Sequence, residues 1–367
     1  MNVLVLTDKL ETGGAETYFC KLENKLSHPN MSFYTAAASG ELSGRIKHKE
    51  AFTTLARRNH LRNLAVLYQL VKRLKIDTIH ANSLRMTLYV ILLHLLGRRK
   101  LKIVYTKHNI TAMEKRLAFL YTKLMNYFVD KIITVSDFEK NNLHRLGVKK
   151  EKIKTIYNGV DLNQFEFAEK KEKAFTRNIG ILARLSKEKN VELFVKIAKE
   201  FKHMPGYRFF IAGDGPEKEN LQNLINRWDL QQKVTLLGAV PQPEKFIKRM
   251  DAILLTSHRE VFPMVVLEAM ASGTPLLTID RGGIREAVID SETGLLISEH
   301  SAADFSHRLR MLDSDESHRE RIIENARRKV EVEFSLDQMI QETLNEYAAL
   351  TNNNLPADSF REEAVLK

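Results

Sequence analysis

The chain has 367 residues, 44% of them hydrophobic and 28% charged, which excludes a fibrous or intrinsically disordered protein. A chain of this length exceeds one ordinary core, so we expect two domains. The net charge of +11 is unevenly divided, because residues 1–160 carry 28 Lys and Arg against 12 Asp and Glu, and the remainder carries 29 against 34. A basic first half predicts an anionic partner, such as a lipid surface, a phosphorylated acceptor or nucleic acid, unless the charge is only solvated.

The single cysteine and the short apolar runs exclude two further classes. Cys20 has no second cysteine with which to form an internal disulfide, and no spacing predicts a zinc site, so a reducing cytoplasm fits. The longest apolar stretch, 84–97, is shorter than the about 20 residues that a spanning helix needs. The opening residues MNVLVLTD lack the basic flank and cleavage site of a secretory signal. We therefore expect no integral membrane segment.

Short apolar runs alternate with helical patterns along the chain. In the first half we predict strands at 2–8, 77–83, 102–108 and 131–136, with helices near 15–27, up to about 96, and over 112–128. The pattern restarts after a turn-rich and then charged stretch at 156–175, with strands predicted at 178–185, 207–215, 234–240, 252–257 and 275–280. Strands that alternate with helices form parallel sheets, so the fold class is α/β with two doubly wound, Rossmann-like domains.

The domain boundary is predicted within the turn-rich stretch. We assign an N-terminal domain to 1–165 and a C-terminal domain to 166–350, and expect the last helix to pack back on the N-terminal domain. Residues 351–367 lack periodicity and predict a mobile tail. In doubly wound sheets ligands bind beyond the carboxyl ends of the strands, so the loops at those ends are the candidate site.

Two of these loops carry groups suited to phosphate. Gly13 and Gly14 follow the first strand and precede a helix, so the backbone can approach a ligand while helix amides face it, although a simple tight turn has the same pattern. Arg184 and Lys189 lie in ARLSKEKN, immediately beyond a strand end, and two cations there could clamp a diphosphate and support its departure, or be solvated.

The stretch REVFPMVVLEAM, 259–270, places two carboxylates eight positions apart. Pro263 predicts a helix start, and the helix is expected from Met264 to Ala271, where Ser272–Pro275 stops it. Its first amides could bind phosphate, while Glu268, one turn in, could accept hydrogen bonds from a ribose diol. Glu260 in the preceding loop could bind sugar hydroxyls. A solvated side chain and an N-cap partner are the structural alternatives.

A histidine and an acidic triplet complete the candidates. His108 ends the strand at 102–108, where it could donate to a sugar hydroxyl or stabilise charge at a reacting carbon, or simply pack. The triplet DSD at 313–315 resembles the Asp-x-Asp metal motif of some sugar transferases, but it lies between two helical patterns and away from any strand end, so we interpret it as a turn with a helix cap.

Together these motifs resemble the retaining glycosyltransferases of family 4, with the GT-B architecture, from residue 1 to about 350. The resemblance is carried, in the family's order, by TGGAE, VSDFEKNNL, IYNGVD, IAGDGP, EVFPMVVLEAMASGTP with its Glu-x7-Glu signature, and GGIREAV. It implies a nucleotide-sugar donor on the second domain and an acceptor on the first. It also implies retention of anomeric configuration by front-side attack, with no metal and no other cofactor.

The resemblance also implies a role for each candidate. Gly13 and Gly14 would approach the diphosphate, which Arg184 and Lys189 would neutralise, and His108 would contact the transferred sugar. On the resemblance, Glu268 would bind the ribose of the donor. The sugar and the phosphate would be bound by Glu260, Phe262, Met264 and Val265. Backbone groups at Leu237, Gly238 and Val240 would contact the base. Catalytic roles fall to His108, Glu260, Arg184 and Lys189.

Three positions depart from the family pattern and limit this transfer. Val261 and Pro263 stand where many members have glycine, and proline offers no N–H to a phosphate. Asn82 replaces a second histidine that is common in the loop IHANS, which leaves the acceptor chemistry there open.

A basic, apolar segment at 111–131 adds a partner. Lys115, Arg116, Phe119 and Lys123 lie in a helical pattern that could rest in a lipid interface, or pack on its own sheet. We therefore expect a cytoplasmic enzyme, peripheral on the inner face of the membrane. It would move a hexose or N-acetylhexosamine from a nucleoside diphosphate sugar, with a UDP-sugar as the expected donor, to a hydroxyl of a glycan or glycolipid. No nucleic acid is expected as a partner. The alternatives are a nucleotide-sugar epimerase and a non-enzymatic protein that binds anionic surfaces or nucleic acid.

Overall fold

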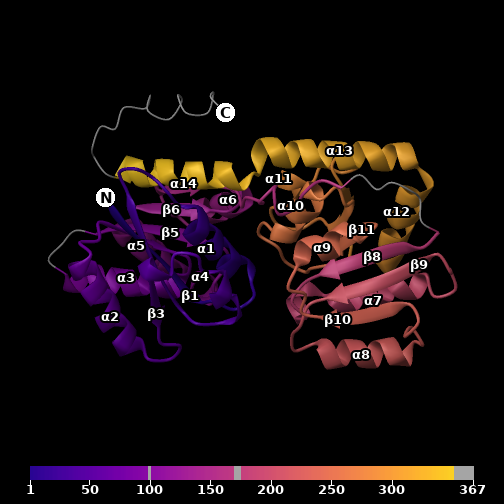
Figure 1. The fold of residues 1–367 in the computed structure, drawn as a ribbon, viewed down its shortest axis with the longest axis horizontal. Coiled ribbons are helices and arrows are strands. Elements are labelled where there is room, and N and C mark those ends of the chain that lie inside the picture. Colours follow the sequence, from indigo (N-terminus) through magenta and orange to yellow (C-terminus); the bar gives the residue numbers. More distant parts are fainter. Residues whose placement is uncertain (98–100, 169–174, 351–367) are drawn as a thin grey trace. The chain divides into compact units, whose positions relative to one another are not determined.

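The computed structural model describes residues 1–97, 101–168 and 175–350, so the predicted mobile tail lies outside the described residues (Figure 1). Contacts divide the chain into two compact units. Among the described residues unit 1 holds Met1–Thr134, Lys140–Ile156 and the chain from Met339, and unit 2 holds Val135–Glu139 and Tyr157–Gln338. Unit 2 thus begins at Tyr157 rather than at the predicted residue 166, because the Tyr157 ring packs against Phe262 and Phe334 of that unit.

Unit 1 contains a parallel sheet in the order β3-β2-β1-β4-β5-β6-β7. Its strands are β1 (Asn2–Lys9), β2 (Ser32–Ala38), β3 (Phe52–Leu55), β4 (Thr78–Ala81), β5 (Lys102–Lys107), β6 (Lys131–Thr134) and β7 (Ile153–Thr155). The strands β1, β4, β5 and β6 were predicted. The strands β2, β3 and β7 were not, because β3 and β7 are short and β2 consists largely of alanine, serine and threonine.

The helices of unit 1 cover both faces of this sheet. They are α1 (Gly14–Lys25), α2 (His60–Arg73), α3 (Leu84–Leu96), α4 (Ala112–Arg116), α5 (Ala118–Phe128), the later part of α6 (Asp137–Arg145) and most of α14 (Leu336–Leu350). Neighbouring residues on β4 face opposite sides. Ile79 joins the core formed with α2, α3 and α5, whereas His80 bonds to Tyr347 of α14. The last helix, which was predicted to pack back on the N-terminal domain, belongs to unit 1 from Met339 onward.

The helix predicted over 112–128 is interrupted. Leu117, with φ −134° and ψ 44°, ends α4 and precedes α5. Each part is oriented by a different partner. Glu114 of α4 pairs with the buried Lys107, whereas α5 packs on the sheet through Tyr121 and Met125. The break at Leu117 lies between these two contacts.

Unit 2 contains a second parallel sheet, in the order β10-β9-β8-β11-β12-β13. Its strands are β8 (Arg177–Leu182), β9 (Tyr207–Ala212), β10 (Val234–Gly238), β11 (Ala252–Leu255), β12 (Leu276–Ile279) and β13 (Leu295–Ile297). Five of these strands were predicted, and the three-residue β13 was missed. This is the strand order of a dinucleotide-binding Rossmann fold.

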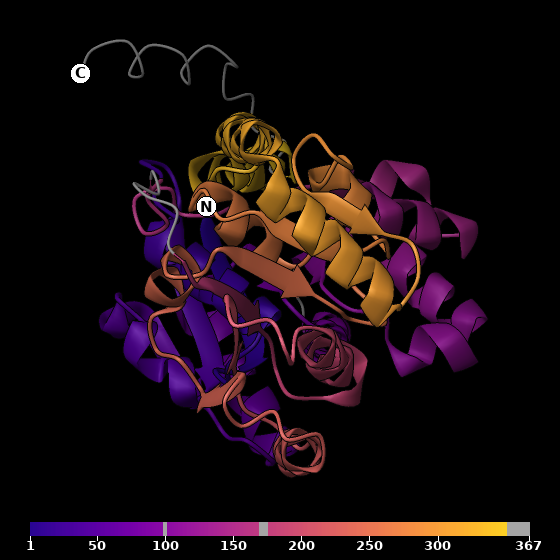
Figure 2. The same cartoon turned by 90° about the vertical axis from the view of Figure 1, so that its right-hand side faces the viewer.

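Helices cover both faces of the second sheet as well (Figure 2). Leu254 of β11 packs on one face with α7 (Val191–Glu200), α8 (Lys218–Arg227) and α12 (Ala302–Ser314). Its neighbours Ile253 and Leu255 pack on the other face with α9 (Pro243–Lys248), α10 (Met264–Ala271) and α13 (Glu316–Glu333). Because both faces are buried, the strands are continuous apolar runs, as expected of parallel sheets.

Candidate functional site

The strand order of unit 2 reverses between β8 and β11, and the loops that follow these two strands carry the predicted donor-binding residues. Such a reversal opens a crevice at the carboxyl edge of a doubly wound sheet, where ligands bind. The loop after β8 contains Arg184 and the short helix η4 (Lys187–Lys189), and the loop after β11 contains Glu260. Topology therefore brings together residues that are about 70 positions apart in the chain.

Lys189 and Glu260 form an ion pair at this crevice. Lys189 Nζ lies 2.7 Å from Glu260 Oε1; the glutamate is buried and the lysine is about a quarter exposed. Two further bonds join the same loops, since His258 N–H donates to the Glu188 carbonyl and the Thr256 hydroxyl to that of Asn190. The cation is thereby fixed in position, while the Arg184 side chain is exposed.

The helix α10 begins directly after this loop, at the predicted residue. Pro263 is its N-cap, with an extended ψ of 133°, and the N–H groups of the first turn of any helix lack an acceptor in a preceding turn. Such a helix start favours an anion. Glu268 lies on the second turn and is buried, with 8% of its surface exposed, so it is not the solvated side chain that was the alternative interpretation. Gly273, with φ +71°, follows the helix end.

The segment after β12, Asp280–Gly283, supports the Glu260 loop from one side. Gly282 has φ +65°, and a Cβ atom there would lie 1.7 Å from the Glu260 carbonyl oxygen. Gly283 N–H donates to the Val261 carbonyl at 3.0 Å. Glycine is therefore required at both positions, because the two backbones approach closely. The hydrogen bond of Gly283 also holds the Glu260 loop in place.

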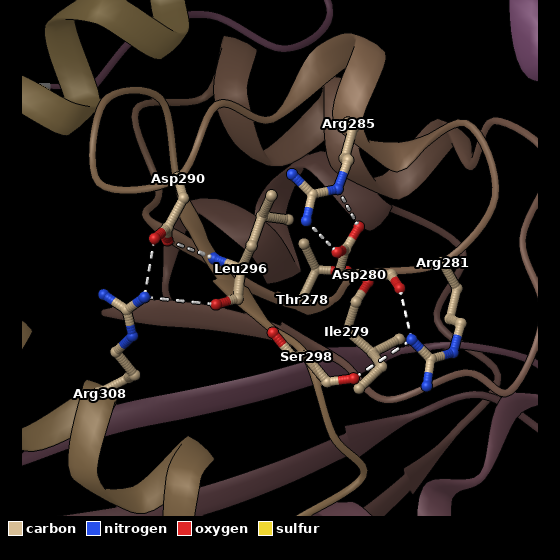
Figure 3. Close-up of polar contacts among 9 residues, drawn as sticks. All are labelled: Thr278, Ile279, Asp280, Arg281, Arg285, Asp290, Leu296, Ser298 and Arg308. Carbon is tan, nitrogen blue, oxygen red and sulfur yellow. Dashed lines mark hydrogen bonds and ion pairs between the residues drawn. The ribbon is translucent and has the colours of Figure 1, made fainter.

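Arginines hold this glycine segment (Figure 3). Arg285 forms two parallel bonds to the Asp280 carboxylate, one of them 2.7 Å from Nε to Oδ1. Arg281 donates to the Asp280 carbonyl at 2.8 Å and to the Ser298 carbonyl at 3.2 Å. Bidentate guanidinium–carboxylate contacts combine strength with geometric definition. Nearby, Arg308 donates through one nitrogen to the Asp290 carboxylate at 2.8 Å, and Asp290 accepts from Leu296 N–H with its other oxygen.

Tyr157 and Asn158 support the loop from the other side. Asn158 Nδ2 donates to the Phe262 carbonyl at 2.8 Å, and Tyr157 stacks on the Phe262 ring with 5.1 Å between centroids. The Tyr157 hydroxyl donates to Asp137 at 3.3 Å, and burial, followed by the nearby carboxylates of Glu286 and Asp137, raises the tyrosine pKa. Asn158 itself is buried, and its Oδ1 makes no hydrogen bond with any described residue.

The predicted base-binding segment lies at the end of β10. Gly238 has φ +72°, and its carbonyl accepts from Gly213 N–H at 2.7 Å. Leu237 is exposed, and Val240 packs against the core of the α10 face. The structure thus places the segment at the same carboxyl edge as Lys189 and Glu260, two strands from the crevice.

In unit 1 the order reverses between β1 and β4, and the glycine pair follows β1. Gly13 is the N-cap of α1, and a Cβ atom at Gly14 would meet nothing within 4 Å, so one side of this backbone is open. The Glu16 carboxylate lies over Gly13 instead, and burial, with a smaller contribution from Asp8, raises its pKa. The backbone at Gly14 is therefore the more open of the two, as Gly13 is covered by Glu16.

His108 follows β5 in the same unit. Its ring contacts Tyr18 of α1 edge to face, with 4.7 Å between centroids, and its Nε2 is buried without a hydrogen bond to any described residue. Burial, and secondarily the cation of Lys107, lowers the pKa of His108 to about 3. The histidine is therefore neutral at physiological pH, and can accept or donate a hydrogen bond but carries no charge.

The other notable residue at this edge is Asn82, directly after β4. It is buried, and neither side-chain atom is hydrogen-bonded to a described residue, while its N–H donates to the Leu6 carbonyl. Two residues earlier, His80 is fully buried between the Tyr347 and Thr106 hydroxyls, at 2.5 Å each, and burial lowers its pKa to about 3.

The basic apolar segment presents its charged and aromatic side chains outward. Phe119, Lys123 and Tyr127 recur at four-residue spacing on α5, away from the buried Tyr121 and Met125. Phe119 is 74% exposed and Tyr127 81%, and Lys123 Nζ lies 4.4 Å above the Phe119 ring. Lys115 and Arg116 on α4 are exposed as well. The helix α5 therefore packs on its sheet with one face. Its opposite face carries an outward row of two aromatic side chains and a lysine.

The acidic triplet is structural. Asp315 is the N-cap of α13, where it accepts from His318 N–H, and Asp313 pairs with Arg177 and accepts from Tyr207. Within the described ranges no three acidic, histidine or cysteine side chains are grouped so that they could hold a metal ion. Nor does any helix in the described part of the chain have the length and apolar character needed to cross a bilayer.

Sequence reasoning missed the residues that support the site. Tyr157, Asn158, Gly282 and Gly283 lie in motifs that had been recognised, but their individual roles depend on which backbone each one meets. Lys107 was missed for a different reason, because a lysine at a strand end predicts a solvated side chain. Glu286 accepts from the N–H groups of Asp137 and Phe138 at 2.7 Å each, and so caps α6 from a distant segment.

Comparison with known families agrees with this architecture. Residues 12–164 match the family described as Glycosyltransferase Family 4, and residues 163–329 match Glycosyl transferases group 1. The chain is similar to the Escherichia coli O-antigen biosynthesis glycosyltransferase WclY, with 31% identity over 56% of this chain and 61% of that protein. It is also similar to the putative colanic acid biosynthesis glycosyltransferase WcaL of E. coli K12, with 30% identity over 56% and 53%. It spans less than two thirds of these curated relatives.

Solved structures share the whole fold. HepE from Anabaena, crystallised with UDP-glucose, superposes with a TM-score of 0.82 over 95% of this chain and all of that chain, at 20% identity. Sucrose-phosphate synthase from Thermosynechococcus elongatus superposes with a TM-score of 0.78, over 95% and 99%, at 18% identity. The fold is GT-B. The two family matches run in sequence from residue 12 to residue 329, and both describe glycosyltransferases.

Proposed function

We propose that the protein transfers a hexose or N-acetylhexosamine from a nucleoside diphosphate sugar, with UDP as the favoured nucleotide, to a hydroxyl of a glycan or glycolipid acceptor in envelope polysaccharide assembly, with retention of configuration and without a metal. The observation that carries this proposal is the pairing of Lys189 with Glu260 beside the start of α10. The UDP-glucose bound in the HepE crystal structure supports the choice of donor. The O-antigen biosynthesis named for WclY supports the pathway.

Each chemical requirement of such a donor has a group at the unit 2 crevice. The diphosphate is anionic, and Lys189, Arg184 and the helix start of α10 supply positive potential. The ribose diol and the sugar need acceptors of hydrogen bonds, which Glu268 and Glu260 supply. Because Glu260 already holds Lys189, the donor meets a cation in a defined place instead of ordering a flexible side chain, which lowers the entropic cost of binding.

Lys189 and Arg184 would act on the leaving group. Negative charge grows on the departing diphosphate as the glycosidic bond breaks, and fixed cations stabilise that charge. The departing phosphate would take the acceptor proton on the same face of the sugar, which retains the configuration. His108, neutral at physiological pH, would hydrogen-bond to the transferred sugar rather than supply a positive charge.

Thermal shift and donor hydrolysis test this proposal. We expect UDP-glucose or UDP-N-acetylglucosamine to stabilise the protein and to be hydrolysed slowly, in buffer with EDTA as in buffer without it, and GDP- and ADP-sugars to do so less. Proton NMR of the transfer product would give its anomeric configuration. Activity that EDTA abolishes would reject metal independence, and absence of binding by any activated sugar would reject the function.

A second proposal, peripheral membrane binding by unit 1, rests on the outward row of α5. Phe119 and Tyr127 are large and exposed, and Lys123 lies above the Phe119 ring. Lys115 and Arg116 are exposed on the preceding helix α4, and the first 160 residues carry the excess of basic charge. Aromatic and basic side chains on one helix face suit an anionic lipid interface. We expect cosedimentation with vesicles of phosphatidylcholine and phosphatidylglycerol, and not with phosphatidylcholine alone.

The double substitution Phe119→Ser and Lys123→Gln should remove this cosedimentation without changing hydrolysis of a soluble donor. Lys196→Gln, on an exposed face of α7 in unit 2, is the matched control and should bind vesicles as the wild type does. Equal sedimentation of the double variant and the control would reject the membrane surface.

A further inference from the structure

A buried ion pair lies directly beside His108. The Lys107 and Glu114 side chains are 0% and 3% exposed, and Nζ lies 2.8 Å from Oε2. Burying two charges carries a large desolvation penalty, so such a pair is a poor device for stability alone. A lysine at the end of a central strand would more simply be solvated or replaced by an apolar residue. The pair therefore calls for a role beyond packing.

The pair ties both ends of the loop that carries His108. Lys107 Nζ donates to the Asn109 carbonyl at 2.8 Å. Glu114 uses its other oxygen, Oε1, to accept from the Thr111 N–H at 2.8 Å and the Thr111 hydroxyl at 2.6 Å. The loop 108–111 is thus held at both ends, by Lys107 at the end of β5 and by Thr111 at the start of α4. The Glu114 carboxylate contacts both of these residues.

We propose that Lys107 and Glu114 are positioning residues for His108, which hold its loop so that the imidazole meets the transferred sugar as a neutral hydrogen-bonding group. This inference rests on the proposed function for the identity of the ligand. The link between the ion pair and the histidine does not depend on it. Neither residue is expected to touch the substrate.

Several groups face the imidazole. Tyr18 of α1 contacts the ring, and His80 of β4 interacts with it electrostatically. Lys107, the last residue of β5, directly precedes His108 in the chain. Of these, Lys107 brings the positive charge next to the ring. A cation beside a histidine disfavours the imidazolium and lowers the pKa, in the same direction as burial. The pair therefore serves two ends, since it fixes the loop and its cation adds to burial in lowering the pKa of His108.

Histidine imidazole NMR on the full chain tests the link without any donor. The double substitution Lys107→Met with Glu114→Gln removes both charges and leaves an amide oxygen to accept from Thr111. We expect the His108 titration midpoint to rise by about one pH unit, because the adjacent cation is gone while burial remains. Assignment of the signal follows from its loss in His108→Gln. The matched control, Lys196→Met with Glu192→Gln, removes an exposed ion pair on α7 and should leave the His108 signal unchanged.

A second variant covers failure of the double variant to fold. Lys107→Met alone removes the cation and keeps Glu114 as an acceptor for Thr111. The buried carboxyl takes up a proton once its partner is gone, so the His108 midpoint should rise as in the double variant. A folded variant, judged by circular dichroism, with the wild-type His108 midpoint would overturn the proposal.

Donor hydrolysis provides the second readout. With UDP-glucose the double variant should lose about tenfold in kcat, with little change in KM, because the donor binds mainly to unit 2. The acidic limb of its rate profile should move to higher pH by the same interval as the NMR midpoint. If the wild type shows the NMR behaviour but turns over no donor, the proposed function fails and the ion-pair link stands. Normal turnover with an unshifted acidic limb in the folded double variant would reject the positioning role.

Discussion

A Cβ atom at Gly282 would lie 1.7 Å from the carbonyl oxygen of Glu260, so the loops that follow β11 and β12 meet backbone to backbone at this point. Gly283 adds a hydrogen bond to Val261 one residue further on. The side chain that holds Lys189 is therefore located by a contact that any residue larger than glycine would break.

Gly282→Ala should displace the Glu260 loop. A left-handed φ costs an alanine about 1–2 kcal/mol, and the overlap with the carbonyl adds to this cost. We expect a lower free energy of unfolding and at least about tenfold weaker UDP binding, if the loss at the site is of similar size. Chemical denaturation and calorimetry measure these two effects. Gly44→Ala is the control, since a Cβ there meets nothing within 4 Å, and it should bind UDP normally. Unchanged affinity in the folded Gly282 variant would show that the loop position does not matter for the nucleotide.

Glu268→Ala should weaken binding of the donor. Loss of hydrogen bonds from a ribose diol to a buried carboxylate costs about 1.5–3 kcal/mol, which corresponds to more than tenfold in Kd. Calorimetry with UDP and with uracil separates the ribose contribution from that of the base. Glu192→Ala, on an exposed face of α7, serves as the control. Wild-type affinity for UDP in Glu268→Ala would remove the ribose assignment.

Asn158→Ala should loosen the same loop from its other side. The substitution leaves the Phe262 carbonyl without its donor at a buried position, which costs about 1–3 kcal/mol of stability. We expect the melting temperature to fall and kcat for donor hydrolysis to fall with it, while Asn163→Ala, in an exposed part of the same linker, changes neither. Should the variant melt at the wild-type temperature, the hydrogen bond to Phe262 contributes nothing to the loop.

The buried histidines predict a loss of stability in acid. The pKa values of His80 and His108 are lowered from 6.5 to about 3 in the folded chain, chiefly by burial. Between these values the unfolded chain binds protons that the folded chain does not, so the free energy of unfolding falls as pH decreases below 6.5 and is unaffected by these groups above it. Each histidine contributes up to about 1.4 kcal/mol per pH unit in this window.

Urea unfolding at pH 7, 6 and 5 measures this slope. His80→Gln keeps hydrogen-bonding groups for Tyr347 and Thr106 but cannot bind a proton, so it should be less stable at pH 7 and show a smaller decline toward pH 5. The exposed His203→Gln should retain the wild-type slope. Equal slopes in all three proteins would contradict the assignment of the acid sensitivity to His80.

The candidate site divides between what spacing and local pattern could predict and what they could not. The start of α10 at Met264 and the glutamates around it followed from Pro263, from the apolar run and from the stop at Ser272–Pro275. The strands β8 and β11 were also predicted, although they end at Leu182 and Leu255 rather than at 185 and 257, and the loops of Lys189 and Glu260 follow them. That these loops are neighbours depends on strand order, which no local pattern encodes.

Some expectations required correction for the same reason. A single amphipathic helix was predicted over 112–128, yet it breaks at Leu117, between Glu114, which pairs with the buried Lys107, and Tyr121, which is buried on the sheet. The domain boundary moved to Tyr157 because aromatic contacts made far along the chain assign that residue to unit 2. Both differences arise from long-range contacts that override a plausible local pattern.

By itself the sequence determined that this protein has two parallel α/β sheets, because apolar strands alternating with helices leave few other ways to bury both faces. It also determined which strand ends carry cations, carboxylates and glycines. Only the tertiary structure decided that Lys107 is buried against Glu114, that Gly282 touches Glu260, and that Asn158 holds Phe262. Each of these contacts joins segments brought together by sheet order and helix packing, and the free energy of a charge or a backbone group depends on the neighbours it meets there rather than on those beside it in the chain.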